Sequence, residues 1–366
     1  MLHRHYYIEN AKVLADSGTV TVDINVRDPI TALWIRMGNT NGGSYNKANL
    51  VADCLSKIEL IDGGNILWSL NGYEAFALAC YRMGVVPYAL FDEVQGDEQT
   101  LVFPLMFGRY LGDPQYAFNP AAFQNPQIRV QWNMAAVNAV GATGFLTGYG
   151  RLTVIAEILE GAPAPSGMFI GKEHYSFTTA SSGVTYIDLP IDYPYRALMV
   201  RSYKVSTYVN AILTNVKLNC DQGKYIGLDE STTNLLEYWS QAHGPFVYKH
   251  QFYGKDGDTI YPIMKFDEAV APMSSTAGYF CGYGNAGYGS GRFGLYSLAG
   301  AAGSERNIAT IVYGFAPFGH VWVPLGEPSD PEDWFPAPSF KSVRLELTNG
   351  TSSGTGAVVI EQVRPY

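Results

Sequence analysis

One ordered set of features occurs twice along the chain. The first copy comprises, in order, residues 30–36 (ITALWIR), 55–61 (LSKIELI), a Gly63-Gly64 turn, 65–70 (NILWSL) and a helical stretch ending at Gly84. The second comprises residues 195–201 (YRALMVR), 213–219 (LTNVKLN), a Gln222-Gly223 turn, 224–228 (KYIGL) and a helical stretch ending at Gly244. The offset between the copies is 165 residues at the first strand, 158 at the second and 160 at the helix end. A register held this closely predicts two structural units of similar plan.

Short runs rich in β-branched and aromatic residues, separated by turn residues, predict an all-β chain built from two β-sandwiches. The expected strands of the first unit are residues 19–26, 30–37, 55–61, 65–70, 101–107, 128–134 and 151–159. Those of the second are residues 185–189, 195–203, 213–219, 225–228, 259–265, 308–315, 343–347 and 357–363.

Each unit also contains one short helix with end signals of its own. Asn71 is a suitable N-cap for GYEAFALACYRM, and Asp229 or Ser231 for TTNLLEYWSQAH. Gly84 and Gly244 stand where helices commonly stop. We expect each helix to flank a sandwich.

The length of 366 residues fits two domains. We place them at residues 1–165 and 166–366, with the junction near GAPAPSG, residues 161–167. Towards the ends of the units the offset grows to about 205–215 residues, which predicts about 45–55 extra residues after the second helix. Residues 274–306, rich in Gly and Tyr without steady periodicity, are the expected long loop.

Composition narrows the possible functions. Only 16% of the residues are charged, the net charge is -9, and no run of Lys or Arg exceeds a pair, so direct nucleic-acid binding is not expected. The N-terminus has no apolar signal region and no stretch reaches the length of a membrane span, which predicts a soluble protein that is not classically secreted. The four cysteines, widely spaced, are expected to be buried and unpaired: Cys54, Cys80, Cys220 and Cys281.

Motifs that could carry chemistry are sparse. Gly282, Gly284 and Gly287 match G-x-G-x-x-G, but no helix is expected after them to hold a pyrophosphate. The histidines are isolated along the sequence, and the first two lie in an N-terminal segment expected to be mobile: His3, His5, His174, His243, His250 and His320.

The acidic residues do not form a convincing metal site or catalytic pair either. Two acidic loops, Asp256 with Asp258 and Asp330 with Glu332 and Asp333, lack a full calcium ligand set and are interpreted as polar turns. Asn349-Gly350-Thr351 is interpreted as a hairpin turn. Glu157 and Glu237 could only arbitrarily be paired as the two acids of a glycan-cleaving enzyme. We therefore expect no enzyme, and name no catalytic residue, cofactor site or metal site.

The tandem units resemble the double jelly-roll major capsid proteins of prokaryotic viruses, such as those of tectiviruses, corticoviruses and turriviruses. The resemblance rests on the paired segments ITALWIR/YRALMVR and LSKIELIDGG/LTNVKLNCDQG and on the helices ending at Gly84 and Gly244. It implies two jelly rolls in tandem that assemble as a homotrimer with a pseudo-hexagonal outline in an icosahedral shell. Residues 274–306 would then lie in a tower or between subunits, and both chain ends near the inner side of the shell.

The same resemblance implies partners and a location. Neighbouring capsomers, penton or minor capsid proteins and an internal membrane are the expected partners, although the chain shows no basic or amphipathic terminal arm. The protein would be made in the host cytoplasm and reside in the virion. The alternative is a receptor- or carbohydrate-binding β-sandwich of a virus or bacterium, with exposed Tyr and Trp stacking on sugars.

Overall fold

The computed structural model describes residues 1–42, 50–90, 96–134, 144–146, 148–204, 207–254, 259–260, 267–275, 283–286, 293–294 and 306–366. The strands of the first half are β1 (Leu2–Leu14), β2 (Ser17–Asp23), β3 (Ile30–Thr40), β4 (Leu55–Asp62), β5 (Asn65–Leu70), β6 (Ala89–Leu90), β7 (Glu98–Met106), β8 (Pro126–Asn133) and β9 (Gly150–Glu160). Those of the second half are β10 (Gly167–Thr178), β11 (Val184–Leu189), β12 (Tyr195–Tyr203), β13 (Leu213–Cys220), β14 (Tyr225–Ser231), β21 (His320–Pro324), β22 (Val343–Asn349) and β23 (Thr355–Pro365). The α-helices are α1 (Val51–Cys54), α2 (Gly72–Met83), α3 (Val209–Ile212) and α4 (Thr232–His243).

The two halves have the same strand topology. In the first half, one sheet runs β1-β9-β3-β7-β6 and the facing strands run β2-β8-β4-β5. In the second half, the corresponding orders are β10-β23-β12-β21 and β11-β22-β13-β14. Strand by strand these orders match those of two jelly rolls, which confirms the predicted fold class.

Irregularities of strand pairing also recur at matching places. The β1/β9 pairing shifts after Tyr7, and the β10/β23 pairing shifts after Glu173. Between β4 and β5 the register slips after Leu60, and between β13 and β14 it slips after Leu218. A bulge inserts an extra residue at a defined point of a strand, so matching bulges fix the residue-by-residue equivalence of the two halves.

The two jelly rolls share three sheet layers. One buried cluster lies within the first jelly roll and continues onto Met168, Ile170 and Met199 of the second, while another fills the second jelly roll. The sheet that contains β12 and β23 is therefore covered on both faces. This explains why YRALMVR and AVVIEQV are runs of buried residues and not alternating patterns.

Both predicted helices begin and end as expected. Asn71 accepts a hydrogen bond from the Glu74 backbone N–H, and its own N–H donates to the Glu74 carboxyl, each at 3.0 Å. Ser231, not Asp229, caps α4 by accepting from the Asn234 backbone N–H at 3.0 Å. Gly84 closes α2 with a positive φ of 68°.

Replacing either N-cap is expected to destabilise the protein by a similar amount. Asn71→Ala leaves a helix N–H without its side-chain acceptor and should cost about 1 kcal/mol in the free energy of unfolding. Ser231→Ala is the matched control in the other jelly roll, with the same expected cost. Urea denaturation followed by circular dichroism measures both, and a loss confined to one variant would contradict the equivalence of the two caps.

An insertion separates α4 from β21, where the first half has only a short connection from α2 to β7. Its described strands are β15 (Phe246–Gly254), β16 (Thr259–Ile260), β17 (Asp267–Ser275), β18 (Tyr283–Ala286), β19 (Phe293–Gly294) and β20 (Arg306–Phe315). Four of them form a separate sheet in the order β15-β20-β17-β18. The insertion is thus longer than the expected loop at 274–306, and the described parts of that range include short strands. Most of residues 274–306 lie outside the described residues.

Several expectations about single segments were wrong. Residues 2–14 are not mobile but form β1, which pairs antiparallel with β9. The strands β10 and β21 were missed, and residues 308–315 belong to the insertion and not to a sandwich. Of the expected strand at 259–265, residues 259–260 form β16 of the insertion and the rest lies outside the described residues. Asn349-Gly350-Thr351 is not a hairpin turn, because β22 and β23 lie in different sheets and this segment crosses between them.

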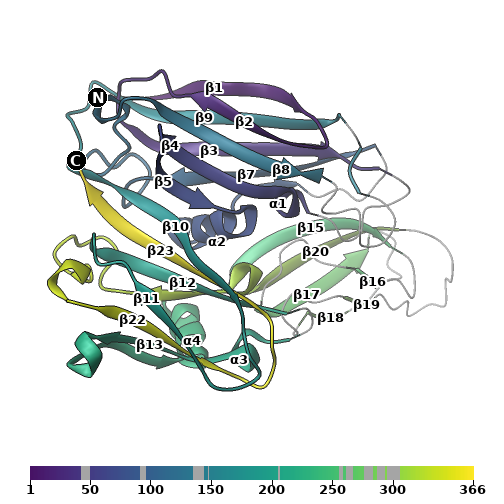
Figure 1. Ribbon diagram of the computed structural model, residues 1–366. Helices are drawn as coiled ribbons and strands as arrows, with labels where there is room; N and C mark the ends of the chain where they lie inside the picture. The colour runs from purple at the N-terminus through teal and green to yellow at the C-terminus, as the bar shows by residue number, and fades with distance from the viewer. Residues whose placement is uncertain are drawn as a thin grey trace.

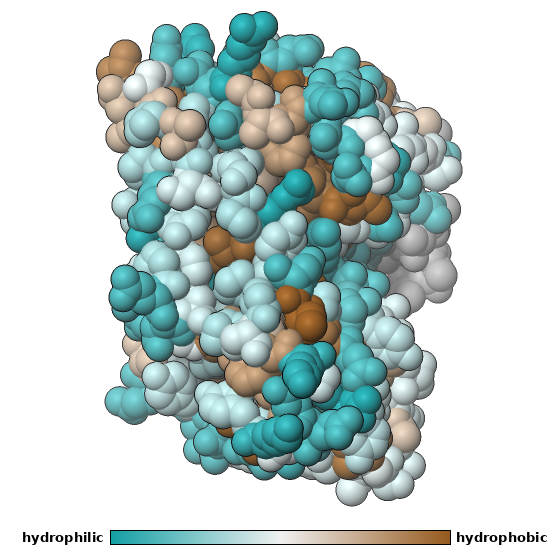
Figure 2. All heavy atoms as spheres, turned by 60° about the vertical axis from the view of Figure 1, so that its left-hand side comes forward, coloured by the Kyte–Doolittle hydropathy of each residue, from teal (hydrophilic) through white to brown (hydrophobic). Residues whose placement is uncertain are grey.

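The chain ends lie together, at the opposite end of the molecule from the insertion (Figure 1). Tyr366 is held there by a hydrogen bond from its hydroxyl to the Ala117 carbonyl at 2.7 Å. Figure 2 shows the end with the termini, where apolar residues form separate patches among polar ones. The boundary near 161–167 stays a prediction, since the sheets are continuous across it.

Candidate functional site

The contact between the two jelly rolls contains a strand pairing, an aromatic cluster and a buried group of ion-paired side chains. We call it the seam, and define it by β5 and α2 of the first jelly roll and by β10, β12 and β23 of the second. β5 pairs with β10 in parallel, with Ser69 opposite Lys172, and this pairing joins strands of both halves into one eight-stranded sheet. Figure 1 shows α2 between the two halves.

Aromatic rings attach α2 to the second jelly roll. The Tyr81 ring stacks on Trp322, with ring centroids 5.2 Å apart, and meets Trp239 and Phe246 edge-on. Its hydroxyl donates a hydrogen bond to the His320 carbonyl at 2.7 Å. Each such pair adds to the free energy of burial, so this cluster resists sliding of one half against the other.

A buried ion triad lies beside this cluster. Glu361 on β23 pairs with Arg82 on α2 and, at 2.8 Å, with Arg196 on β12. All three side chains are at most 6% exposed. Both guanidinium groups lie over the Phe169 ring, at 4.8 and 5.2 Å from its centroid. Arg82 also donates to the Gly108 carbonyl of its own jelly roll, so its charge has partners on both sides of the seam.

The pKa values reflect this pairing. Burial alone would raise the pKa of Glu361, but the two arginines outweigh it and hold that pKa below its usual value. Burial lowers the pKa of Arg82 to about 10, against the opposing effect of Glu361. Glu361 and Arg82 are therefore ionised at neutral pH, and removing one member of the triad would leave a buried charge without its partner.

A second acidic group lies at the start of α2. The Glu74 side chain is buried, and burial raises its pKa to about 9, with a further contribution from the nearby carboxylate of Glu173 on β10. The Asn71 amide donates to Glu173 across the seam at 3.4 Å. Glu74 thus remains protonated at neutral pH, in contrast to Glu361.

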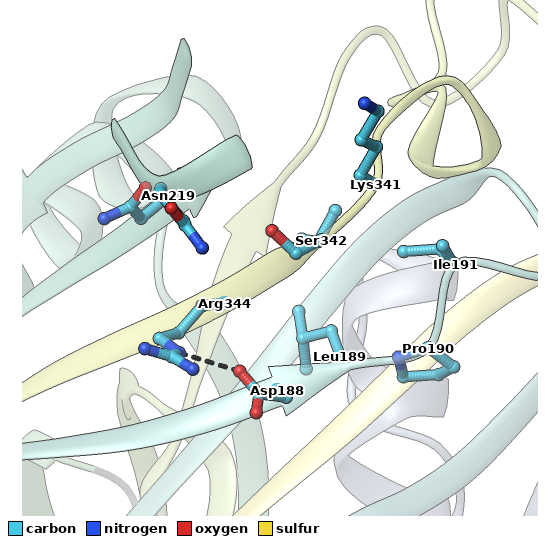
Figure 3. Close-up of a pocket in the computed structure, with 10 residues that line it drawn as sticks. Asp188, Leu189, Pro190, Ile191, Asn219, Lys341, Ser342 and Arg344 are labelled. Carbon is cyan, nitrogen blue, oxygen red and sulfur yellow. Dashed lines mark hydrogen bonds and ion pairs between the residues drawn. The ribbon is translucent and has the colours of Figure 1, made fainter. Parts of the chain in front are cut away.

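Two hollows are the candidates for ligand binding. One, of about 710 Å³, opens at the seam between α2, α4 and the 326–333 turn, and its arginines Arg82, Arg109 and Arg196 are paired with carboxylates. The other, of about 370 Å³, is lined by polar and apolar residues of the second jelly roll around Asp188 and Arg344 (Figure 3). Asp188 and Arg344 pair with each other at 2.7 Å. In both hollows these charges serve internal pairing and do not converge on a ligand position.

The described histidines have separate surroundings. His320 is fully buried with Nδ1 3.0 Å from the Pro317 carbonyl, and burial lowers its pKa to about 3. His243 packs on Trp239, His174 lies 2.8 Å from the Asp188 carbonyl, and His3 is 3.7 Å from Glu157. Within the described ranges, no group of three His, Cys, Asp or Glu side chains forms a metal site. The side chain of His250 on β15 lies outside the description.

The acidic residues considered in the sequence analysis make hydrogen bonds within the fold or lie on its surface. Asp330 and Asp333 accept hydrogen bonds from backbone N–H groups of Glu332 and Glu327, as polar turns do. Glu157 accepts from Trp34 on a neighbouring strand, and Glu237 is exposed on α4 of the other jelly roll, so the two do not face one another across a cleft.

The cysteines and the glycine motif lie partly within the described residues. Three cysteines are buried and unpaired as predicted: Cys54, Cys80 and Cys220. Gly284 lies in β18, while Gly282, Gly287, Cys281, Asp256 and Asp258 lie outside the described residues.

Sequence reasoning missed the seam residues because they are far apart in the chain. Arg82 and Glu361 are separated by 279 residues, and Arg196 and Glu361 by 165. One signal was present: Arg196 and Glu361 are charged residues within mainly apolar runs, YRALMVR and AVVIEQV. A charge in a doubly covered strand requires a buried partner, which marks such positions as candidates for ion pairs.

Two tandem jelly rolls that share one continuous sheet make this chain a double jelly-roll protein. No protein-family model matches the sequence, and no curated protein matches it either. No helix in the described ranges is long and apolar enough to cross a membrane.

Solved structures of viral capsid proteins have the same fold over nearly the whole length. The major capsid protein P2 of bacteriophage PM2 is 10% identical, with a TM-score of 0.57 over 100% of this chain and 98% of its own. The major capsid protein of Sulfolobus turreted icosahedral virus is 9% identical, with a TM-score of 0.59 over 99% and 96%. The capsid of the virus PBCV-1 gives 11% identity and a TM-score of 0.59 over 99% and 93%. The chain therefore has the double jelly-roll fold of these capsid proteins, including its connections and its tandem order.

Proposed function

We propose that this chain is a major capsid protein, which self-assembles as pseudo-hexagonal trimers into an icosahedral virus shell. The observation that carries the proposal is the tandem repeat of one eight-stranded unit, locked at a fixed angle by a buried seam. Three copies of a chain with two equivalent units provide six similar units around one axis, which is the geometry a hexagonal lattice requires. The role is structural and not catalytic.

The position of the chain ends supports an orientation in the shell. Both termini lie at one end of the molecule and the insertion lies at the other (Figure 1). With the strands standing roughly normal to the shell, the termini face inward and the insertion forms a tower or an outer contact between subunits. The partners are neighbouring capsomers, penton or minor capsid proteins and a membrane beneath the shell. The protein is made in the host cytoplasm and resides in the virion.

The burial of the tryptophans gives no support to the alternative of a carbohydrate-binding sandwich. All six tryptophans lie in the described ranges, and each is buried or half-buried: Trp34, Trp68, Trp132, Trp239, Trp322 and Trp334. Stacking on a sugar requires an exposed ring face. No tryptophan is exposed, so the alternative would depend on exposed tyrosines such as Tyr186 and Tyr238.

Light scattering during size-exclusion chromatography, combined with negative-stain imaging, tests the proposal. We expect a particle of three times the chain mass with a hexagonal outline. A chain that is monomeric at every accessible concentration and binds glycans on an array would overturn it.

A further inference from the structure

Two strands in different sheets, β1 and β14, are paired on one side only among the described residues. β1 is the outer strand of the first sheet, and β14 is the outer strand of the last one. Both are exposed, with Tyr6 and Tyr7 on β1 and Tyr225 and Ile226 on β14 each 40–56% accessible to solvent. Long exposed edges with apolar side chains are prone to pair with other strands unless something covers them.

The equivalent edges inside the chain are already joined to each other. β10 of the second jelly roll is the counterpart of β1, and β5 of the first is the counterpart of β14, because each pair occupies the same place in its sheet order. At the seam these two inner counterparts pair in parallel. The chain thus contains one complete example of the contact that its two free edges could make with other copies.

We propose that β14 of one copy pairs in parallel with β1 of the next, so that the seam is repeated between subunits and three copies close into a ring. This inference rests on the proposed capsid function and specifies its trimer contact. A head-to-tail contact of this kind uses two different surfaces of each subunit. It gives a closed ring of three when each subunit is rotated by a third of a turn relative to the one before it.

The bulges give the register of the proposed contact. Tyr7 and Glu173 each directly precede a bulge, so Tyr6 occupies the position of Lys172. Ser69 and Asp229 each lie two residues before a helix N-cap, Asn71 and Ser231. Since Ser69 is opposite Lys172, Asp229 of one copy is expected opposite Tyr6 of the next.

The two edges differ in charge. β1 carries Arg4, which pairs with Glu160 of its own sheet at 3.2 Å, whereas β14 ends in exposed Asp229 and Glu230. A second copy of β14 would place these acidic side chains against each other, so like-charge repulsion favours β1 as the partner. The buried triad has no counterpart there, because the chain has Ala242 on α4 where α2 has Arg82, so the contact between subunits is less tightly locked than the seam.

A cysteine pair tests the register directly. We expect Tyr6→Cys combined with Asp229→Cys to give a covalent trimer on non-reducing gels after mild oxidation, converted to monomer by a reductant. Each single variant should give no trimer band. The matched control is Tyr6→Cys with Tyr186→Cys, since Tyr186 is 61% exposed on β11 at the other edge of the sheet that contains β14.

Charge reversal gives a second test that leaves β1 unchanged. Asp229→Lys with Glu230→Lys should raise the dissociation constant of the trimer at least tenfold, while the same reversal at exposed Asp330 and Glu332 should not. Circular dichroism verifies that both double variants are folded. Trimers that form without the 6–229 cross-link and are unaffected by the reversal would overturn this inference while the proposed function stands. A chain that never forms trimers would overturn both.

Discussion

Replacement of Glu361 by glutamine is expected to lower the free energy of unfolding by about 3–5 kcal/mol, because it leaves two buried guanidinium groups without a counter-charge. Apart from the neutral amide oxygen of the glutamine, Arg82 and Arg196 would keep only backbone carbonyl acceptors, at Met106, Gly108 and Pro328. Since Arg82 belongs to the first jelly roll and Glu361 to the second, the loss should loosen the seam before either sandwich. Urea denaturation measures the change, and hydrogen exchange of α2 amides reports the loosening.

The chain provides a matched control for this substitution. Glu157 occupies the position of Glu361 in the first jelly roll, as it pairs with Ala32 where Glu361 pairs with Ala197. Its partner is the neutral Trp34 Nε1, at 3.0 Å. Glu157→Gln should therefore cost only about 1 kcal/mol. Equal losses in the two variants would show that the buried charge at Glu361 has no special importance.

The triad also predicts behaviour in acid. The folded-state pKa of Glu361 lies below its usual value of 4.5. Its contribution to stability is therefore complete above that pH and is lost as the pH falls through the folded-state pKa. The Glu361→Gln variant should lose less stability than the wild type over this acid range.

Glu74→Gln is expected to make the protein more stable in alkaline solution than the wild type. Burial raises the folded-state pKa of Glu74 to about 9, so between its usual value of 4.5 and about 9 the folded protein holds a proton that the unfolded chain releases. Stability from this group is present at low pH and is lost as the pH rises through that range. Glutamine is neutral at every pH and keeps an oxygen acceptor for the Asn71 N–H.

The measurement is the free energy of unfolding in urea at several pH values from 5 to 9. One pKa unit corresponds to about 1.4 kcal/mol, so the advantage of the variant should grow by at least that amount between pH 5 and pH 8. The second jelly roll supports the substitution. Asn234 stands three residues after its N-cap Ser231, as Glu74 stands three residues after Asn71, and Asn234 carries a neutral amide. Glu237→Gln, at an exposed site on α4, should leave the pH profile unchanged.

Local patterns were sufficient to predict most of the fold. The offset of the repeats, the strands of NILWSL and YRALMVR, and the limits of both long helices followed from periodicity and end signals, and the structure confirms them. β1 was not predicted, because an edge strand exposed on both faces shows no alternation of apolar and polar residues, as in LHRHYYIENAKVL. β21 was missed because four of its five residues are buried in succession, which leaves no apolar alternation to recognise.

The seam depended on information that no local pattern contains. Which residue meets Glu361 is decided by how two sandwiches pack, and that packing depends on α2 inserting between sheets far apart in sequence. The motifs that the sequence did display, such as G-x-G-x-x-G and the acidic turns, contributed nothing to the site. What the sequence alone could have indicated was that Arg196 and Glu361, charged residues within the mainly apolar runs YRALMVR and AVVIEQV, needed partners.

The matching bulges have a consequence for the history of the chain. A bulge adds a residue to one strand, and nothing in the demands of packing requires two separate sandwiches to place it after the same residue of the same strand. The extra residues are Ile8 and His174 in one matching pair of strands and Leu67 and Gly227 in another, which is the pattern expected if the two halves arose by duplication of one sandwich. The two halves thus share the course of the backbone, down to its irregularities, although many of their side chains differ.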